Sequence, residues 1–142
     1  MPGLEEIRQA VLRFRDERNW SQFHTLRNLI VSLNLEAAEL LELTQWKDDT
    51  EVAAFANTSQ GQEALADECA DVLLYLLLIA DKAGINLEDA AKAKLTKNAL
   101  KYPIEKSIGT SKKYTELECQ ESDDRNQESV GGRLEPECIN NK

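Results

Sequence analysis

The feature that most constrains the fold is a run of apolar residues over 72–80, within the longer segment 63–81. Read as a helix, this run is apolar on every side, which is typical of a helix buried in a core. Glu68 and Asp71 precede or border the run, and with Tyr75 they follow the i, i+3, i+7 spacing that places side chains on one stripe. Ionised carboxylates are costly to bury unless something neutralises them. The segment therefore predicts a core helix whose acidic stripe binds a cation, with a metal ion as the leading candidate.

The chain length and charge limit the classes of function. A chain of 142 residues is long enough for one domain with a single core. Its net charge of -9 argues against binding nucleic acid through bulk electrostatics, although a nucleotide that brings its own divalent cations is not excluded. The longest apolar run is about half the ~18 to 20 residues of a membrane-spanning helix, so no membrane association is expected.

Two features of the sequence bear on cellular location. Residues 1–6 lack the basic start and apolar stretch of a signal peptide. The three cysteines are odd in number and none lies in a CxxC pair, so neither a disulfide framework nor a zinc site is indicated. A reduced, cytoplasmic location is therefore expected.

Helical spacing of apolar residues recurs along most of the chain and predicts an all-α fold. Thr50 is expected to cap a short helix, and Ser59 with Gln62 forms a capping-box pattern for the helix after it. Gly84 is expected to end that helix, and Pro103 to stop the last one. Helices are predicted over about 3–18, 25–46, 51–56, 59–83 and 86–102.

The composition changes near residue 115. Residues 116–142 contain eight acidic and three basic residues, a net charge of -5, and few aliphatic side chains. Such a composition does not favour a packed core. The sequence therefore predicts a folded domain over 1–115 and an acidic, flexible tail over 116–142.

The helix predicted over 25–46 carries a second acidic stripe. At 100° per residue, the side opposite its apolar face collects Glu36, Glu39, Glu42 and Trp46. On its own, such a stripe is an ordinary solvated face. A tryptophan on the same line as the carboxylates suits the wall of a pocket better than open water.

The two stripes form a pair of similar motifs, Glu36-x-x-Glu39 and Glu68-x-x-Asp71. On two antiparallel helices, all four carboxylates could converge on one point. Two unit charges ~4 Å apart repel by roughly 4 kcal/mol at an effective dielectric near 20, so four of them require a cation. Oxygen ligands without histidine or cysteine select a hard ion, Mg²⁺ before Mn²⁺ or Ca²⁺. One ExxE motif is common in helices, whereas two pairs beside an apolar run are a more specific signal.

Aromatic and basic residues elsewhere allow two interpretations each. Trp20 and His24 lie in a short polar segment, which favours a packing lid over the core, with a stacking surface for a ligand ring as the alternative. Lys94, Asn98 and Tyr102 share one side of the last predicted helix. That side is either a solvated basic face, which suits the end of a helix, or a cationic lip for phosphates.

The two carboxylate pairs, separated by 28 residues, resemble the signature of the all-α nucleoside triphosphate pyrophosphohydrolases of the MazG type. The resemblance covers about residues 4–115. Animal members have a histidine in the first helix, where this chain has Val11. Four further segments resemble the dCTP pyrophosphatase branch of that family: 18–24, 27–29, 45–47 and 94–103.

This resemblance implies both a reaction and an assembly. Members hydrolyse a (deoxy)nucleoside triphosphate, here dCTP or a related dNTP, to the monophosphate and pyrophosphate with Mg²⁺, Mn²⁺ being possible. They build four-helix bundles from two chains, often as a dimer of dimers. Glu36 or Glu39 is the candidate for the general base. Carried over by position, the metal ligands are Glu36, Glu39, Glu68 and Asp71, the base and sugar pocket contains Trp20, His24, Trp46 and Tyr75, and the phosphates face Lys94, Asn98 and Tyr102.

An all-apolar helix also requires more cover than one small chain provides, so an obligate dimer is expected. Two alternatives to dCTP hydrolysis stay open. One is hydrolysis of another phosphoanhydride, such as dUTP or a phosphoribosyl nucleotide. The other is a non-catalytic helical dimerisation or adaptor module whose acidic groove binds a basic partner.

Overall fold

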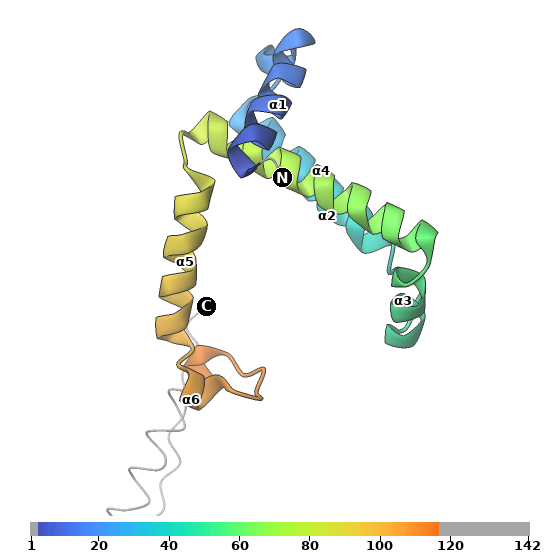
Figure 1. The fold of residues 1–142 in the computed structure, drawn as a ribbon, viewed down its shortest axis with the longest axis vertical. Helices are drawn as coiled ribbons and strands as arrows, with labels where there is room; N and C mark the ends of the chain where they lie inside the picture. The colour runs from blue at the N-terminus through green and yellow to red at the C-terminus, as the bar shows by residue number, and fades with distance from the viewer. Residues whose placement is uncertain (1–2, 117–142) are drawn as a thin grey trace, which may run out of the picture. The chain divides into compact units, whose positions relative to one another are not determined.

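The computed structural model describes residues 3–116, and every regular element in that range is a helix (Figure 1). The all-α fold class predicted from the sequence is therefore confirmed. The chain divides into two compact units, Met1–Ala90 and Ala91–Lys142, of which residues 3–90 and 91–116 are described. The acidic tail predicted over 116–142 lies outside the described residues, apart from Glu116. The elements are α1 (Leu4–Glu17), a 3-10 helix η1 (Trp20–Gln22), α2 (Leu26–Glu42), α3 (Asp49–Ala56), α4 (Ser59–Ala83), α5 (Leu87–Lys101) and α6 (Ile104–Ser107).

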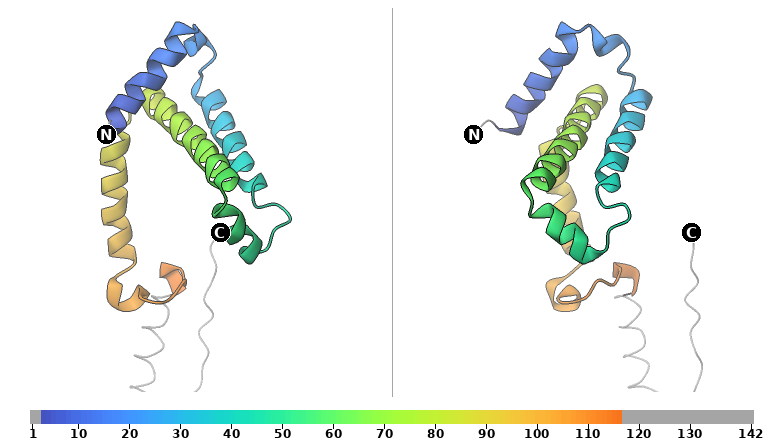
Figure 2. Two further views of the ribbon diagram at one scale, coloured as in Figure 1. Left: turned by 45° about the vertical axis from the view of Figure 1, so that its right-hand side comes forward. Right: turned by 90° about the vertical axis from the view of Figure 1, so that its right-hand side faces the viewer.

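The first unit is organised around α2 and α4. These two helices run antiparallel and side by side, joined by α3, and α1 packs against α4 (Figure 2). The 3-10 helix connects α1 to the start of α2. The antiparallel pair is the arrangement that the two acidic stripes require, because residues from both helices can then face the same space.

Short polar side chains fix where the helices of this unit begin. The Asn28 backbone N–H donates to Thr25 Oγ1 over 3.1 Å at the start of α2. Asp48 caps α3 through a capping box with Glu51, so the predicted cap at Thr50 is wrong. Thr58, rather than the predicted Ser59, caps α4 by accepting from the Gly61 N–H over 2.9 Å. Each corrected cap lies one or two residues earlier, because a neighbouring hydroxyl or carboxylate reaches the free N–H groups better.

Glycines explain two of these boundaries. A Cβ at Gly61 would lie 2.0 Å from the Phe55 carbonyl oxygen, so only glycine fits where α3 and α4 meet. Gly84 ends α4 with φ 66°, as predicted. The Asp89 N–H donates to Asn86 Oδ1 over 3.1 Å at the start of α5, which confirms the predicted start there.

The predicted end of α2 at Trp46 is wrong, because the helix ends at Glu42. The Thr44 hydroxyl donates to the Leu41 carbonyl over 2.8 Å, and Lys47 Nζ donates to the Leu43 carbonyl over 2.7 Å. Such side-chain bonds compete with continuation of the helix. Trp46 then adopts φ 65° in a turn and is not on the stripe that carries the carboxylates.

Very little of the apolar surface is buried within this single chain. Leu29, Leu77, Leu78 and Ala80 are the buried apolar residues of the described range, and Leu77 is only 1% exposed. Residues 72–76 are only half-buried, in line with the expectation that one small chain cannot cover this helix on all sides. None of the helices within residues 3–116 is long and apolar enough to cross a membrane.

The second unit contains the end of α5, the short α6 and the segment up to Glu116. Pro103 separates the two helices and is the residue that precedes α6. The rings of Tyr102 and Tyr114 meet edge to face, with centroids 6.1 Å apart. Lys101 Nζ lies 4.7 Å from the centre of the Tyr114 ring, so a small aromatic and cationic cluster holds this unit together.

Candidate metal and nucleotide site

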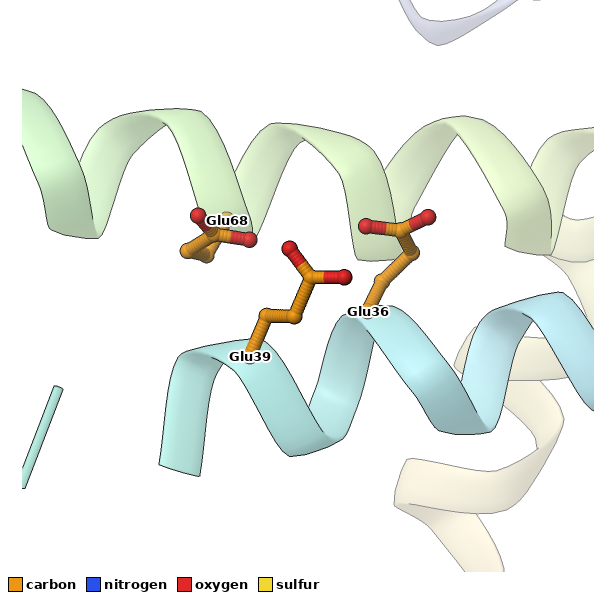
Figure 3. Close-up of side chains that lie close together, drawn as sticks. All are labelled: Glu36, Glu39 and Glu68. Atoms are coloured by element: carbon orange, nitrogen blue, oxygen red, sulfur yellow. The ribbon is translucent and has the colours of Figure 1, made fainter. Parts of the chain in front are cut away.

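Three carboxylates converge between α2 and α4. Glu36 and Glu39 point from α2 and Glu68 points from α4 into the same space (Figure 3). One oxygen of each lies within 4.8 Å of the others. Asp71, one turn after Glu68, is outside this close trio, although its charge acts on both Glu36 and Glu68. The i, i+3 spacing in both helices produces this convergence, because it places each pair on one face.

The carboxylate cluster lacks a neutralising charge. Burial raises the pKa of the Glu68 carboxyl, and the charges of Glu39 and Asp71 raise it further. The pKa of the Glu36 carboxyl is also raised, first by burial and then by the neighbouring carboxylates. Among residues 3–116, no lysine or arginine forms an ion pair with any of these carboxylates.

Glu68 also has an unused ligand atom. Its Oε2 is buried and has no hydrogen-bond partner, and a buried polar atom left unpaired is unfavourable. A hard divalent cation would satisfy this oxygen and relieve the repulsion at the same time. The donor set therefore fits a metal ion of the Mg²⁺ class.

The raised carboxyl pKa values predict a pH dependence of stability. A carboxyl whose pKa is higher in the folded than in the unfolded state stabilises the protein below its unfolded pKa and loses this effect as the pH rises through the folded value. In the metal-free protein, Glu68→Gln should therefore raise the melting temperature at pH 7, and this gain should shrink as the pH falls toward the ordinary carboxyl value of 4.5. Melting curves of both proteins over that pH range measure the difference. A gain that is independent of pH would show that Glu68 is not under charge repulsion.

A cavity of about 370 Å³ adjoins the carboxylates, between α1, η1 and α4. Four residues predicted to be functional line it, namely Trp20, His24, Asp71 and Tyr75. Asp71 belongs to the cavity wall and also acts electrostatically on the carboxylate cluster, so the two features are neighbours. Most other lining residues are apolar, which suits a flat, largely apolar ring.

His24 brings a buried polar atom without a partner to this wall. Its Nδ1 is buried without a hydrogen bond. Burial lowers the pKa of its imidazole, and the charges of Arg15 and Lys82 lower it further. The ring is therefore neutral at pH 7 and can accept or donate one hydrogen bond inside the cavity.

The cavity also contains a residue that the sequence analysis missed. Arg15 lines it from α1, four residues after Val11. A signal was present in the sequence, because Arg15 stands at i+4 from an apolar residue of α1 and so lies on the face that packs inward.

Comparison with known proteins identifies the family. The model of the MazG-like family matches residues 31–117, a range that contains both carboxylate pairs. The chain belongs to the MazG-like family. The resemblance seen in the sequence is thereby confirmed.

Two relatives and one solved structure share 40% to 42% sequence identity with this chain. dCTP pyrophosphatase 1 of Mus musculus is 42% identical over 116 residues, which are 82% of this chain and 68% of that protein. The protein of the same name from Homo sapiens is 40% identical over 116 residues, with the same shares. The crystal structure of a pyrophosphatase from Archaeoglobus fulgidus has 41% sequence identity and a TM-score of 0.65, covering 72% of this chain and 94% of that chain.

The remaining predicted site residues of this MazG-like chain do not line the cavity. Trp46 is 93% exposed in the turn after α2. Lys94, Asn98 and Tyr102 belong to the second unit, where Lys94 is exposed and Asn98 is half-buried. Their roles in nucleotide binding therefore stay predictions.

Proposed function

We propose that this chain hydrolyses a deoxynucleoside triphosphate, dCTP or a related dNTP, to the monophosphate and pyrophosphate in a reaction that requires a divalent metal ion. The observation that carries the proposal is the cluster of Glu36, Glu39 and Glu68, which lacks a countercharge and adjoins a cavity with aromatic walls. Relatives named dCTP pyrophosphatase 1 support the choice of substrate.

The carboxylates supply the chemistry of the proposed metal site. Glu36, Glu39, Glu68 and Asp71 would hold Mg²⁺, with Mn²⁺ as the second candidate because both accept oxygen ligands. A divalent cation, when bound, neutralises charge on the phosphates and lowers the pKa of a bound water. Glu36 or Glu39 would accept the proton of the attacking water on a carboxylate oxygen.

The cavity is the proposed place for the base and sugar. Trp20 and Tyr75 offer aromatic surfaces to the ring, and His24 offers a neutral polar edge. Stacking on such walls selects the shape of a ring rather than its exact chemistry. Lys94, Asn98 and Tyr102 are proposed to bind the phosphates, and Trp46 to cover the base.

The proposed enzyme is a homodimer, with dimers pairing into a tetramer. Large apolar side chains of α2 and α5 are exposed in the single chain, including Leu35, Leu41, Leu95 and Leu100. Large apolar side chains exposed on each of these helices are typical of an interaction site. A second chain would cover it and complete a four-helix bundle. A cytoplasmic location is proposed with it, in keeping with the free thiol of Cys69.

A nucleotide panel tests the proposal. The protein is incubated with dCTP, dUTP, dTTP, dATP or dGTP, with Mg²⁺ or with EDTA, and the products are separated by anion exchange. The expected result is monophosphate and pyrophosphate in equal amounts, highest for dCTP and absent with EDTA. Release of orthophosphate, or turnover that persists in EDTA, would contradict the proposed reaction. Absence of turnover together with no melting shift by Mg²⁺ and dCTP would favour the adaptor.

A further inference from the structure

The cavity proposed for the base and sugar, here called the base cavity, is lined by one cationic residue that takes no part in the proposed metal chemistry. The Arg15 side chain is only 15% exposed and lines the cavity together with Trp20, His24 and Tyr75. Its charge is close enough to His24 to act on the imidazole. Of the residues that line this cavity, Arg15 is the one with a permanent positive charge.

Two carboxylates hold the Arg15 guanidinium in place. Nε donates to Asp16 Oδ1 over 2.7 Å, and Nη1 donates to Asp81 Oδ2 over 3.3 Å. No hydrogen bond or ion pair within residues 3–116 uses Nη2. A guanidinium is planar and rigid, so fixing two of its nitrogens also fixes the direction of the third. Nη2 thus keeps two N–H donors unused on a residue that lines the cavity.

The surroundings of Arg15 suit a neutral acceptor better than a phosphate. Asp16 pairs with Arg15, and Asp81 is shared between Arg15 and Arg8, so the positive charge of Arg15 is already matched by its neighbours and adds little attraction for a polyanion. The side of the cavity near the proposed metal is marked by Asp71, whereas Arg15 projects from α1 beside Val11. Val11 has no polar atom, which leaves Arg15 as the hydrogen-bond donor of this helical wall.

We infer that Arg15 determines base specificity by donating from Nη2 to a carbonyl oxygen of the nucleobase. This inference rests on the proposed function, because it requires a base in the cavity. Cytosine carries a carbonyl oxygen that can accept a charge-assisted hydrogen bond from Nη2, the nitrogen of Arg15 that its two carboxylate partners leave unused. Adenine has no carbonyl group and presents an amino donor instead. The site therefore favours carbonyl-bearing bases, cytosine among them, over adenine.

The chain provides a matched control for Arg15. Arg8 donates to the other oxygen of Asp81 over 2.8 Å, from the same helix. It lines a different cavity, next to Glu5 and Asp81, and has no place in the wall of the base cavity. Arg8→Met therefore removes an ion pair with the same carboxylate without removing any residue that lines the base cavity.

The experiment compares wild type, Arg15→Met, Arg15→Lys and Arg8→Met on dCTP, dATP and the 5′-triphosphate of 2-deoxyribose, which has no base. Arg15→Met is expected to lower kcat/KM for dCTP by about 10- to 100-fold, the effect of losing a hydrogen bond to a charged group. For the triphosphate without a base, kcat/KM should change by less than about threefold. Arg15→Lys should restore only part of kcat/KM for dCTP. Arg8→Met should leave the ratio of dCTP to dATP turnover unchanged.

An equal loss on dCTP and on the baseless triphosphate would overturn the inference, as would the same change in Arg8→Met. Binding of dCMP, measured by the change in tryptophan fluorescence, separates this outcome from failure of the proposed function. If no triphosphate is hydrolysed, the proposed function is wrong, while dCMP binding still tests the role of Arg15. Absence of dCMP binding, or binding that Arg15→Met does not weaken, would overturn the inference itself. Circular dichroism and melting curves verify that each variant is folded.

Discussion

Replacing Glu68 by glutamine is expected to lower turnover of deoxynucleoside triphosphates by about 10²- to 10⁴-fold, while the metal-free protein stays folded. Glutamine has nearly the shape of glutamate and lacks the charge that a divalent cation requires. The carboxylate it replaces has a buried oxygen without a partner and a raised pKa caused by burial and by its acidic neighbours. Removing that charge weakens the metal site and relieves repulsion, so activity and stability should change in opposite directions.

Glu63→Gln is the matched control for this substitution. Glu63 lies on the same helix, is exposed, and is not part of the carboxylate cluster. It changes the net charge of the protein by the same amount, so any general electrostatic effect on a polyanionic substrate appears in both variants. Near-normal turnover by the Glu68 variant, or an equal loss in the Glu63 control, would show that Glu68 is not a metal ligand.

The second large effect concerns assembly. Leu35→Asp is expected to convert the proposed dimer into monomers and to abolish turnover. Leu35 is 58% exposed in the single chain and lies one turn after Val31, which is also exposed, so the two form an apolar strip on α2. On a true surface, such a change alters stability by roughly 0.5 kcal/mol or less. An unpaired charge placed in a subunit interface should instead raise the dimer dissociation constant by about 100-fold or more.

Analytical ultracentrifugation over a range of protein concentrations measures this effect. Asn34→Asp serves as the control, because it places the same charge on the neighbouring position of α2, where a polar side chain already stands. A wild-type protein that sediments as a monomer would contradict the proposed assembly. So would a Leu35 variant that dimerises as tightly as the control.

Local periodicity accounts for what the sequence predicted correctly. Glu36, Glu39 and Glu68 meet because the i, i+3 spacing within each helix and the antiparallel pairing of two amphipathic helices both follow from the pattern of residues. The end of α4 was also predictable, since Gly84 is the residue best suited to a left-handed backbone. These features depend on neighbours in the chain or on one strong apolar pattern.

Features that depend on competition or on other chains were harder to predict. The hydroxyl of Thr44 bonds to a backbone carbonyl near the end of α2, and the helix ends before Trp46. At the start of α4, Thr58 is the N-cap although Ser59 is also a residue type that caps helices. In the sequence, Arg15 cannot be distinguished from an ordinary surface cation. Its place in the cavity and its pairing with Asp81 of α4 depend on the packing of α1 against α4. The apolar run of α4 is half-buried in the single chain, as expected for a helix that one small chain cannot cover.

Carboxylates of α2 and α4 are proposed to share one divalent cation beside the base cavity. The most direct test is the anomalous diffraction of crystals grown with Mn²⁺ and a non-hydrolysable dCTP analogue. The account predicts a manganese peak between Glu36, Glu39 and Glu68, bonded to the phosphates, with the cytosine ring between Trp20 and Tyr75. A peak elsewhere on the chain, or a nucleotide bound with no metal at these carboxylates, would contradict it.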